Sequence, residues 1–256
     1  MPLFSVISIC YNDLENLKRT YNSVSSQTSK DYEWLVIDGA SNDGTPKWLS
    51  KLENEQLSWI SEKDHGIFNA MNKGLDQSKG EYLIFMNSGD LFADSEVLKK
   101  VKQKIKENTR VDFLYGDSVD FTKDNHEFSK KSRHYSSMWK GMFTQHQAMF
   151  FAKDHLNGLQ YRENLKITAD YAFICEFIKT RCTSEGIVKL EFPVCRFLLG
   201  GTNEVQRIKA LNEDFYTRKN ILGLNNFVNS GLYVAHLMHH LLKKYIPFIP
   251  RLLRYN

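Results

Sequence analysis

The sequence predicts an α/β protein with a doubly wound, mainly parallel sheet. In the first half, short apolar runs alternate with segments whose apolar positions recur every three or four residues, which is typical of strands alternating with helices. Residues 62–90 show this pattern in its most complete form, with a helix starting at Ile67, a Lys79-Gly80 turn and a strand from Tyr82 to Met86. That strand is almost entirely apolar, as expected where helices cover both faces of a sheet.

The other elements of the first half follow the same alternation. Strands are predicted over residues 3–9, 33–37, 57–60 and 111–115. Three signals mark the starts of helices: an Asn12–Glu15 capping box, Pro46 in a first turn, and Asp94 as an N-cap.

The second half departs from strict alternation. It predicts a hairpin over residues 117–131 around 123–125, a strand over 147–151, a helix over 168–180, two short strands, and a helix over about 203–222. No linker separates it from the first half, so we expect it to be built onto the same sheet. The prediction is one domain over residues 1–222, followed by a distinct tail over 223–256.

The tail contains an amphipathic helix. Its apolar stripe comprises Val234, Leu237, Met238, Leu241, Leu242 and Tyr245, and its other face is rich in His and Lys. Such a helix can lie on an anionic membrane surface or pack its stripe on the domain, and both alternatives stay open. His236 and His240 lack a third ligand in the pattern, so they do not predict a metal site.

Composition and charge exclude several classes of protein. With 42% hydrophobic and 25% charged residues, the chain is an ordinary globular protein. A net charge of +4, with no basic run in the first half, argues against nucleic acid as a partner. Four cysteines without CxxC spacing, no signal peptide at the N-terminus and no apolar stretch of transmembrane length favour a cytoplasmic protein.

Two common nucleotide-binding motifs are absent from the sequence. The segment after the first strand, Cys10 to Asp13, holds none of the glycines of a dinucleotide-binding loop. The sequence GxxxxGK[ST] of a phosphate-binding loop is also missing. A nucleotidyltransferase on a similar sheet would need a glycine- and lysine-rich opening loop, which this chain lacks.

Three acids stand where α/β proteins bind ligands, past strands or at a helix start. Asp38 can accept hydrogen bonds from a base or ribose, or simply form a turn. Asp90 can hold Mg²⁺ or Mn²⁺ together with a diphosphate, or form a turn. Asp170, in the first turn of a helix, can act as a general base or merely interact with the helix dipole. Together with the polar residues Asn72, Lys73 and His146, these three acids suggest a metal-assisted enzyme acting on a phosphorylated ligand.

Several motifs occur together in one order: SVISICYN, VIDGASNDGT, EKDHGIFNAMNKG, GEYLIFMNSGD, HQAMFF and TADYAFICEF. In this order and spacing, over roughly residues 3–205, the chain resembles the inverting glycosyltransferases of family 2, which have the GT-A fold. It is most similar to the bacterial subgroup that builds exopolysaccharide, capsule and O-antigen units, including colanic acid and amylovoran enzymes. The resemblance implies a nucleotide-sugar half over residues 1–116 and an acceptor half over 117–222.

The resemblance also implies roles for individual residues. Asp170 matches the general base, and Asp90 matches the last acid of the metal-binding loop. The acceptor side is matched by His146 and Gln147. The donor side is matched by Ile9, Tyr11, Asp38, Glu62, Asp64, Asn72, Lys73, Gly74, Ser88 and Gly89. Because Asn87 and Gly89 replace acids of the usual loop, binding of Mn²⁺ or Mg²⁺ would rely on Asp90 and the donor diphosphate.

The implied reaction moves a sugar, with inversion, from a nucleotide-diphosphate sugar to a sugar hydroxyl. UDP is favoured as the nucleotide, and the acceptor is a glycan or an undecaprenyl-linked glycan of a bacterial surface polysaccharide. Residues 234–254 would give peripheral contact with the cytoplasmic face of the inner membrane. The alternative is a catalytically silent protein that binds nucleotide sugars without transferring them.

Overall fold

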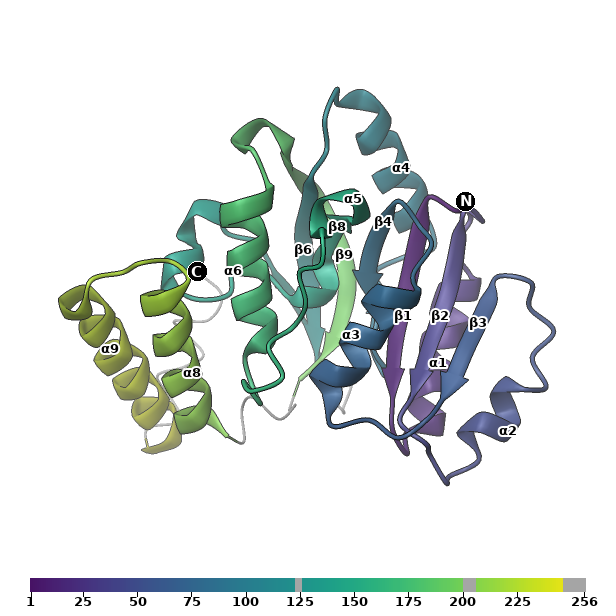
Figure 1. Ribbon diagram of the computed structural model, residues 1–256, viewed down its shortest axis with the longest axis horizontal. Coiled ribbons are helices and arrows are strands. Elements are labelled where there is room, and N and C mark those ends of the chain that lie inside the picture. The colour runs from purple at the N-terminus through teal and green to yellow at the C-terminus, as the bar shows by residue number, and fades with distance from the viewer. Residues whose placement is uncertain (123–125, 200–205, 246–256) are drawn as a thin grey trace.

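A computed structural model describes residues 1–122, 126–199 and 206–245 of the chain (Figure 1). Its strands are β1 (Phe4–Cys10), β2 (Tyr32–Asp38), β3 (Leu57–Ser61), β4 (Tyr82–Phe85), β5 (Leu91–Phe92), β6 (Phe113–Phe121), β7 (Glu127–Lys130), β8 (Met149–Ala152) and β9 (Ile187–Leu198). Its α-helices are α1 (Leu14–Ser25), α2 (Thr45–Leu49), α3 (Ile67–Gln77), α4 (Val97–Glu107), α5 (Lys153–Leu156), α6 (Ala169–Arg181), α8 (Arg207–Asn220) and α9 (Asn226–Tyr245).

The described strands form one sheet in the order β3-β2-β1-β4-β8-β6-β9-β5, with β7 paired to β6. The first four strands in this order are parallel, as predicted from the alternation of strands and helices. Antiparallel β8 then joins β4 to β6, and β9 runs parallel to β6. Strands from both halves of the sequence therefore share one sheet.

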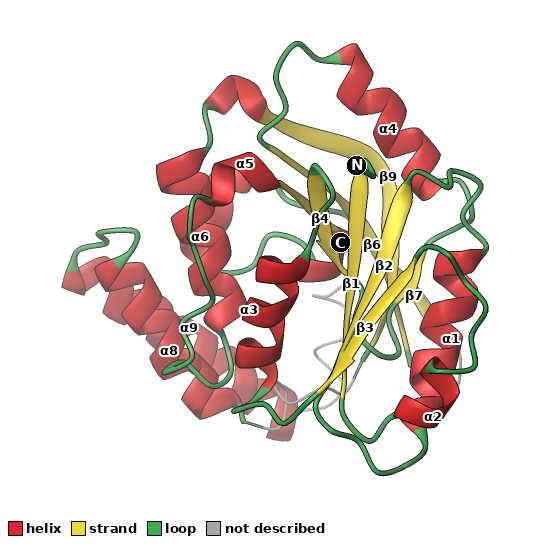
Figure 2. Cartoon of the chain, turned by 45° about the vertical axis from the view of Figure 1, so that its right-hand side comes forward, coloured by secondary structure: helices red, strands yellow, loops and turns green. Residues whose placement is uncertain are grey.

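Helices cover both faces of this sheet (Figure 2). Along β1, Ile7 and Ile9 pack in one apolar core with α3 and α6. Their neighbours Val6 and Cys10 pack in the other core, with α1, α2 and α4. Because successive side chains of a strand point to opposite faces, a β1 without exposed residues between its ends requires cover on both sides. The doubly wound architecture predicted from the sequence is confirmed.

The start of α1 differs from the predicted capping box. Asn12 lies before the helix with φ 50°, and Asp13 occupies the N-cap position. The first helical N–H, that of Leu14, donates instead to Asp43 Oδ2 at 2.9 Å. The Asn12–Glu15 prediction is therefore wrong, because the loop after β2 supplies the capping carboxylate from 29 residues away.

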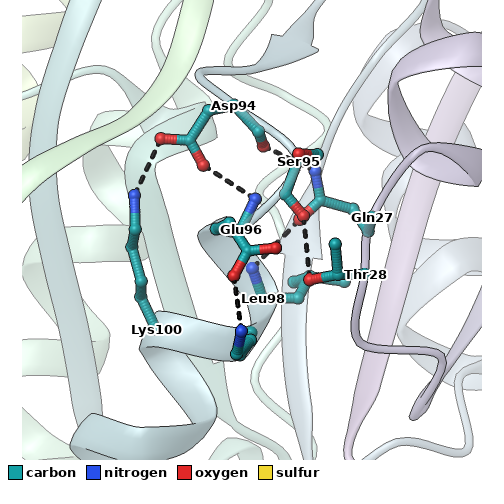
Figure 3. Close-up of polar contacts among 8 residues, drawn as sticks. Gln27, Thr28, Asp94, Ser95, Glu96, Leu98 and Lys100 are labelled. Carbon is teal, nitrogen blue, oxygen red and sulfur yellow. Dashed lines mark hydrogen bonds and ion pairs between the residues drawn. The ribbon is translucent and has the colours of Figure 1, made fainter.

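The start of α4 also depends on a distant residue (Figure 3). Asp94 was expected to cap this helix, but its Oδ1 accepts from Glu96 N, ahead of the first helical residue. The N–H of Leu98 donates to Gln27 Oε1 at 3.0 Å, and Gln27 Nε2 donates to the Asp94 carbonyl at 2.7 Å. Gln27, in the loop just after α1, thus caps α4 and holds the preceding loop.

In the second half, the predicted helix over 168–180 and the hairpin are confirmed as α6 and as β6 with β7. The hairpin tip at 123–125 and residues 203–205 of the last predicted helix lie outside the described residues. Residues 146–148 form a 3-10 turn, so β8 begins at Met149 rather than at 147. The two short strands are one long strand, β9, whose pairing with β6 shifts register beside Pro193.

The final helix, α9, packs on α8 through polar side chains. Arg218 Nε donates to Asn229 Oδ1 at 2.8 Å, and Asn229 Nδ2 donates to the Phe215 carbonyl at 2.9 Å. Much of its apolar stripe stays exposed, including Val234, at 55%, and Met238, at 52%. No helix among the described residues has the length and hydropathy needed to cross a bilayer.

Candidate functional site

The carboxyl ends of the parallel strands open onto two adjoining hollows. The larger, which we call the central cleft, has a volume of about 620 Å³ and is lined by Asp90 and Asp170 among others. The smaller, the outer cavity, measures about 560 Å³. Both are lined by Asp13, Ile67, Asn87 and Ser88, so they form a continuous site. This is the edge at which open α/β sheets bind ligands.

Asp90 is held at the floor of the central cleft. Its side chain is buried, and its Oδ2 accepts a hydrogen bond of 2.8 Å from Gln147 Nε2. Burial raises the pKa of Asp90 to about 7, because a carboxylate is poorly solvated there, and the Gln147 hydrogen bond opposes this shift. The backbone around it is fixed by Thr20, whose hydroxyl donates to the Asp90 carbonyl and accepts from Gly89 N.

The loop before Asp90 offers oxygen ligands suited to a hard divalent cation. Asn87 Oδ1 is buried without a hydrogen-bond partner among the described residues, and Asn87 lines both hollows. Ser88 Oγ donates to Asp13 Oδ2 at 2.8 Å, which keeps that carboxylate at the same edge. In the described part of the chain, no three His, Cys, Asp or Glu side chains are grouped to hold a metal by themselves. Asp90 and Asn87 therefore fit a cation that also takes oxygens from a bound diphosphate.

Asp170 stands in the first turn of α6 and lines the central cleft. Burial raises the pKa of Asp170 to about 6, and the nearby negative charge of Asp214 adds to the rise. At neutral pH the carboxylate is mostly ionised, yet it is basic enough to accept a proton. These are the properties expected of a general base.

Glu213 of α8 fixes the segment that leads to Asp170. Its two carboxylate oxygens accept hydrogen bonds of 2.8 Å from the backbone N–H groups of Lys166, Ile167 and Thr168. Three charge-assisted bonds to consecutive residues leave this segment little freedom. A residue more than forty positions away in the sequence thus positions the candidate base.

The outer cavity is lined by Ile9, Tyr11 and Asp64, three residues predicted for the donor side. Tyr11 is 66% exposed, which leaves its ring free to stack on a planar ligand. Asp64 passes very close to Gly39, where an added Cβ would meet Asp64 Oδ2 at 2.6 Å. Only glycine at position 39 permits this approach.

Asp38 is fully buried beneath the outer cavity and does not line it. Its Oδ2 accepts from Ser41 N at 3.0 Å and from Ser61 Oγ at 2.6 Å, and its Oδ1 accepts from Ser41 Oγ at 2.5 Å. These bonds hold together the loops after β2 and β3. Contact between Asp38 and a ligand would require some of them to be exchanged.

The predicted donor residues of α3 and the segment before it have internal partners. Asn72 Nδ2 donates to the Tyr161 carbonyl at 3.0 Å, and its Oδ1 accepts from Tyr161 N at 2.7 Å. Gly74 packs on β1, where an added Cβ would meet Ile7 Cγ2 at 2.6 Å. Lys73 forms a 2.7 Å ion pair with Glu62. None of these four predicted residues lines the central cleft or the outer cavity.

The two residues predicted for the acceptor side, His146 and Gln147, both line the central cleft. His146 is buried, its ring stacks on Phe85 at 5.2 Å, and its Nε2 pairs with the Tyr161 hydroxyl at 2.9 Å. Burial lowers the pKa of His146 to about 3, so the ring is neutral. Both side chains thus also have structural partners in the wall of the cleft.

Asp13, Lys166 and Glu213 were not predicted from the sequence as functional residues. Asp13 and Lys166 line the central cleft, and Glu213 acts through the backbone before Asp170. The position of Asp13 just after the first strand was a usable signal. Nothing near Glu213 in the sequence indicates its distant partners.

Comparison with known proteins identifies relatives of this chain. The model of the family described as "Glycosyl transferase family 2" matches residues 5–165. An uncharacterized glycosyltransferase of Mycobacterium tuberculosis is 37% identical over 120 residues, which are 46% of this chain and 46% of that protein. The match thus spans about half the length of that relative. A PGL/p-HBAD biosynthesis glycosyltransferase of Mycobacterium bovis is 26% identical over 186 residues, 67% of this chain and 68% of that protein.

Solved structures share the fold. S. aureus TarS 1-349 in complex with UDP-GlcNAc gives a TM-score of 0.67 at 19% identity, covering 96% of this chain and 73% of TarS 1-349. Mannosyltransferase PcManGT from Pyrobaculum calidifontis, in complex with GDP-Man and Mn²⁺, gives 0.64 at 16% identity, covering 96% and 77%. At these identities the likeness concerns the fold, and it confirms the predicted GT-A architecture.

Proposed function

Because this chain belongs to glycosyl transferase family 2, we propose that it transfers a sugar from a nucleoside diphosphate sugar to a hydroxyl of a glycan acceptor, with inversion. The observation that carries the proposal is that Asp90 and Asp170 line one cleft at the carboxyl edge of the sheet. One of these acids can face the leaving diphosphate, and the other can face the attacking hydroxyl.

The nucleoside belongs in the outer cavity, where Tyr11 offers an exposed ring and Asp64 offers a carboxylate for ribose hydroxyls. The diphosphate then reaches Asn87 and Asp90, and the sugar enters the central cleft. We favour UDP, because the resemblance stated above implies it and because TarS binds UDP-GlcNAc and UDP.

Asp170 acts as the base in a single displacement. The acceptor hydroxyl oxygen forms a bond to the anomeric carbon while the bond from that carbon to the diphosphate oxygen breaks. Asp170 takes the hydroxyl proton, and the nucleoside diphosphate leaves with the bonding electrons. The attack comes from the face opposite the leaving group, so one step without an enzyme nucleophile inverts the anomeric centre.

Asp90 and Asn87 would hold Mn²⁺ or Mg²⁺ together with the donor diphosphate. A cation bound there supplies positive charge that offsets the charge developing on the leaving phosphate. Since this set contains one carboxylate, with a pKa of about 7, we expect weak binding of free metal and tighter binding once the nucleotide is present.

The proposed acceptor is a glycan of a bacterial surface polysaccharide, carried on an undecaprenyl-type lipid. The exposed apolar residues of α9 support contact with the cytoplasmic face of the membrane that holds such a lipid. Flotation with anionic vesicles tests this contact. A Val234→Asp/Met238→Asp variant should lose flotation, whereas Ile208→Asp, which alters a 49% exposed side chain of α8, should keep it.

The transferase proposal is tested by hydrolysis of UDP-sugars with Mn²⁺, a slow reaction that needs no acceptor. Wild-type protein should release UDP from at least one sugar of a panel. Asp170→Asn should still bind that donor in calorimetry and should lose transfer to a glycan acceptor by two to four orders of magnitude, roughly the contribution of a general base. Transfer by Asp170→Asn at the wild-type rate would remove Asp170 from the mechanism.

A silent nucleotide-sugar-binding protein is the second candidate. Its support is the lack, among the described residues, of a metal-binding group made of three side chains, and the presence of Asn87 and Gly89 in the loop. It predicts donor binding in the same calorimetry without release of UDP. Turnover by wild-type protein excludes it.

A further inference from the structure

Asp170 lines a second hollow besides the central cleft. This basic cavity has a volume of about 260 Å³ and shares Asp170 and Met142 with the central cleft. Four nitrogen-bearing side chains line it: Arg133, Lys140, Arg207 and His236. The residues come from separate parts of the fold, with Arg133 and Lys140 before β8, Arg207 on α8 and His236 on α9.

The charges in this cavity are not balanced by ion pairs. Across the described ranges, no carboxylate lies within ion-pair distance of Arg133, Lys140 or Arg207. Asp170 and Asp214 also line the cavity, so three cations face two carboxylates. The wall is net positive when all five groups are ionised, and positive walls attract anions.

His236 adds an unused polar atom to the same wall. Its Nδ1 is buried without a hydrogen-bond partner in the part of the chain that the structure describes. Its ring lies close to Gly141, 3.9 Å from where a Cβ would stand. Burial, with the charges of Arg218, Arg207, His239 and Arg133, lowers the pKa of His236 to about 4. The neutral ring contributes one N–H donor rather than a charge.

We propose that the basic cavity binds an oxyanion of the acceptor, a phosphate ester or a sugar carboxylate, and so brings the attacking hydroxyl to Asp170. Arginine forks bind both kinds of oxyanion through paired N–H groups. The position fits this role, because an anion in the cavity lies beside the base and next to the central cleft. The proposal rests on the proposed function, since it assumes that Asp170 faces an acceptor.

Binding of two small probes to the full chain tests the cavity. Inorganic phosphate is followed by ³¹P line broadening and glucuronate by saturation transfer, with UDP and diamagnetic Mg²⁺ at saturation so that the donor site is blocked. Arg207→Gln should weaken the favoured probe about tenfold, the loss expected for a charge-assisted contact, and Arg207→Lys should weaken it less. Lys140→Gln should also weaken binding of the favoured probe. Because Lys140 is exposed, this substitution is not expected to disturb the fold.

Lys51→Gln removes one positive charge from an exposed position after α2 and should leave both probes bound as in wild type. Preference for phosphate identifies a phosphate ester as the ligand class, and preference for glucuronate identifies a sugar acid. If neither probe binds under UDP saturation, or if all the cavity variants bind like wild type, the basic cavity is refuted. Wild-type protein that binds a probe but never turns over a nucleotide sugar refutes the proposed function instead.

Discussion

Gln147 donates a 2.8 Å hydrogen bond to Asp90, so a residue predicted for the acceptor side is a direct partner of the candidate metal ligand. This bond lowers the pKa of Asp90, against the effect of burial. Gln147→Leu should therefore raise that pKa above about 7 and move metal-dependent UDP release to higher pH. The measurement is a pH profile of hydrolysis at fixed Mn²⁺. Gln160→Leu, which removes a glutamine near exposed Asp76, should leave the profile in place.

Asp90 should also make stability depend on pH. Its folded pKa of about 7 lies above the ordinary 3.8. The contribution of Asp90 to the free energy of unfolding is therefore largest below about pH 4 and is lost as pH rises through about 7, because the buried carboxyl must ionise. The Asp90→Asn variant lacks this term, so its free energy of unfolding should fall less than that of wild type between pH 5 and pH 8 and should exceed it at pH 8, by at most about 4 kcal/mol. Urea denaturation with EDTA at pH 5 and 8 measures it, and an equal fall in both proteins would contradict the burial argument.

Asp214 should influence the pH dependence of transfer through the pKa of Asp170, the candidate base. Asp170 must be ionised to accept a proton, so transfer should fall as pH decreases through about 6. The negative charge of Asp214 raises the pKa of Asp170, and Asp214→Asn should move this acidic limb toward lower pH. A pH profile of kcat measures the shift. A limb that moves upward instead would show that loss of structure outweighs the charge effect.

Substitution of two glycines distinguishes a position beside the proposed donor site, Gly39, from a position in the apolar core, Gly74. Gly39→Ala should displace Asp64 and weaken UDP binding about tenfold, with little loss of stability, because Asp64 Oδ2 would lie 2.6 Å from the new Cβ. Gly74→Ala should instead lower the free energy of unfolding by about 1–3 kcal/mol through overpacking against Ile7. Calorimetry and urea denaturation of both variants decide between these roles. The reverse pattern would place Gly74, rather than Gly39, at the donor site.

Glu213 should matter for turnover more than for donor affinity. Glu213→Ala leaves the N–H groups of residues 166–168 without their carboxylate partner. We expect kcat to fall at least tenfold while the KM for the donor stays within about twofold, because a misplaced base slows the chemical step alone. Glu213→Gln retains one acceptor oxygen and should restore part of kcat. Equal losses of kcat and donor affinity would indicate a general fold defect.

Elements with strong internal patterns were predictable from the sequence. The apolar run of β4 and the stripe of α3 decide their own structure through local burial. The caps of α1 and α4 were not predictable, because Asp43 and Gln27 come from other loops. The length of β9 was missed for a similar reason, since pairing with β6 carries the strand past Pro193.

Some residues of the candidate site could likewise be predicted from the sequence, and others could not. Asp90 and Asp170 could be located because each follows a recognisable element, a buried strand and a helix start. Asn72 and Asp38 have the composition of ligand residues, yet their side chains bond Tyr161, Ser41 and Ser61. Sequence spacing places a residue on an element but does not say which side chains meet across the fold.

The hydrogen bonds between Glu213 and residues 166–168 limit how a chimera of this chain and a relative can be designed. The family match ends at residue 165, just before this network begins. If residues 166–181 of this chain were replaced by those of a relative while α8 stayed, the Glu213 carboxylate would face a segment other than the one it holds here. A chimera built on this chain should therefore exchange residues 166–181 and α8 together.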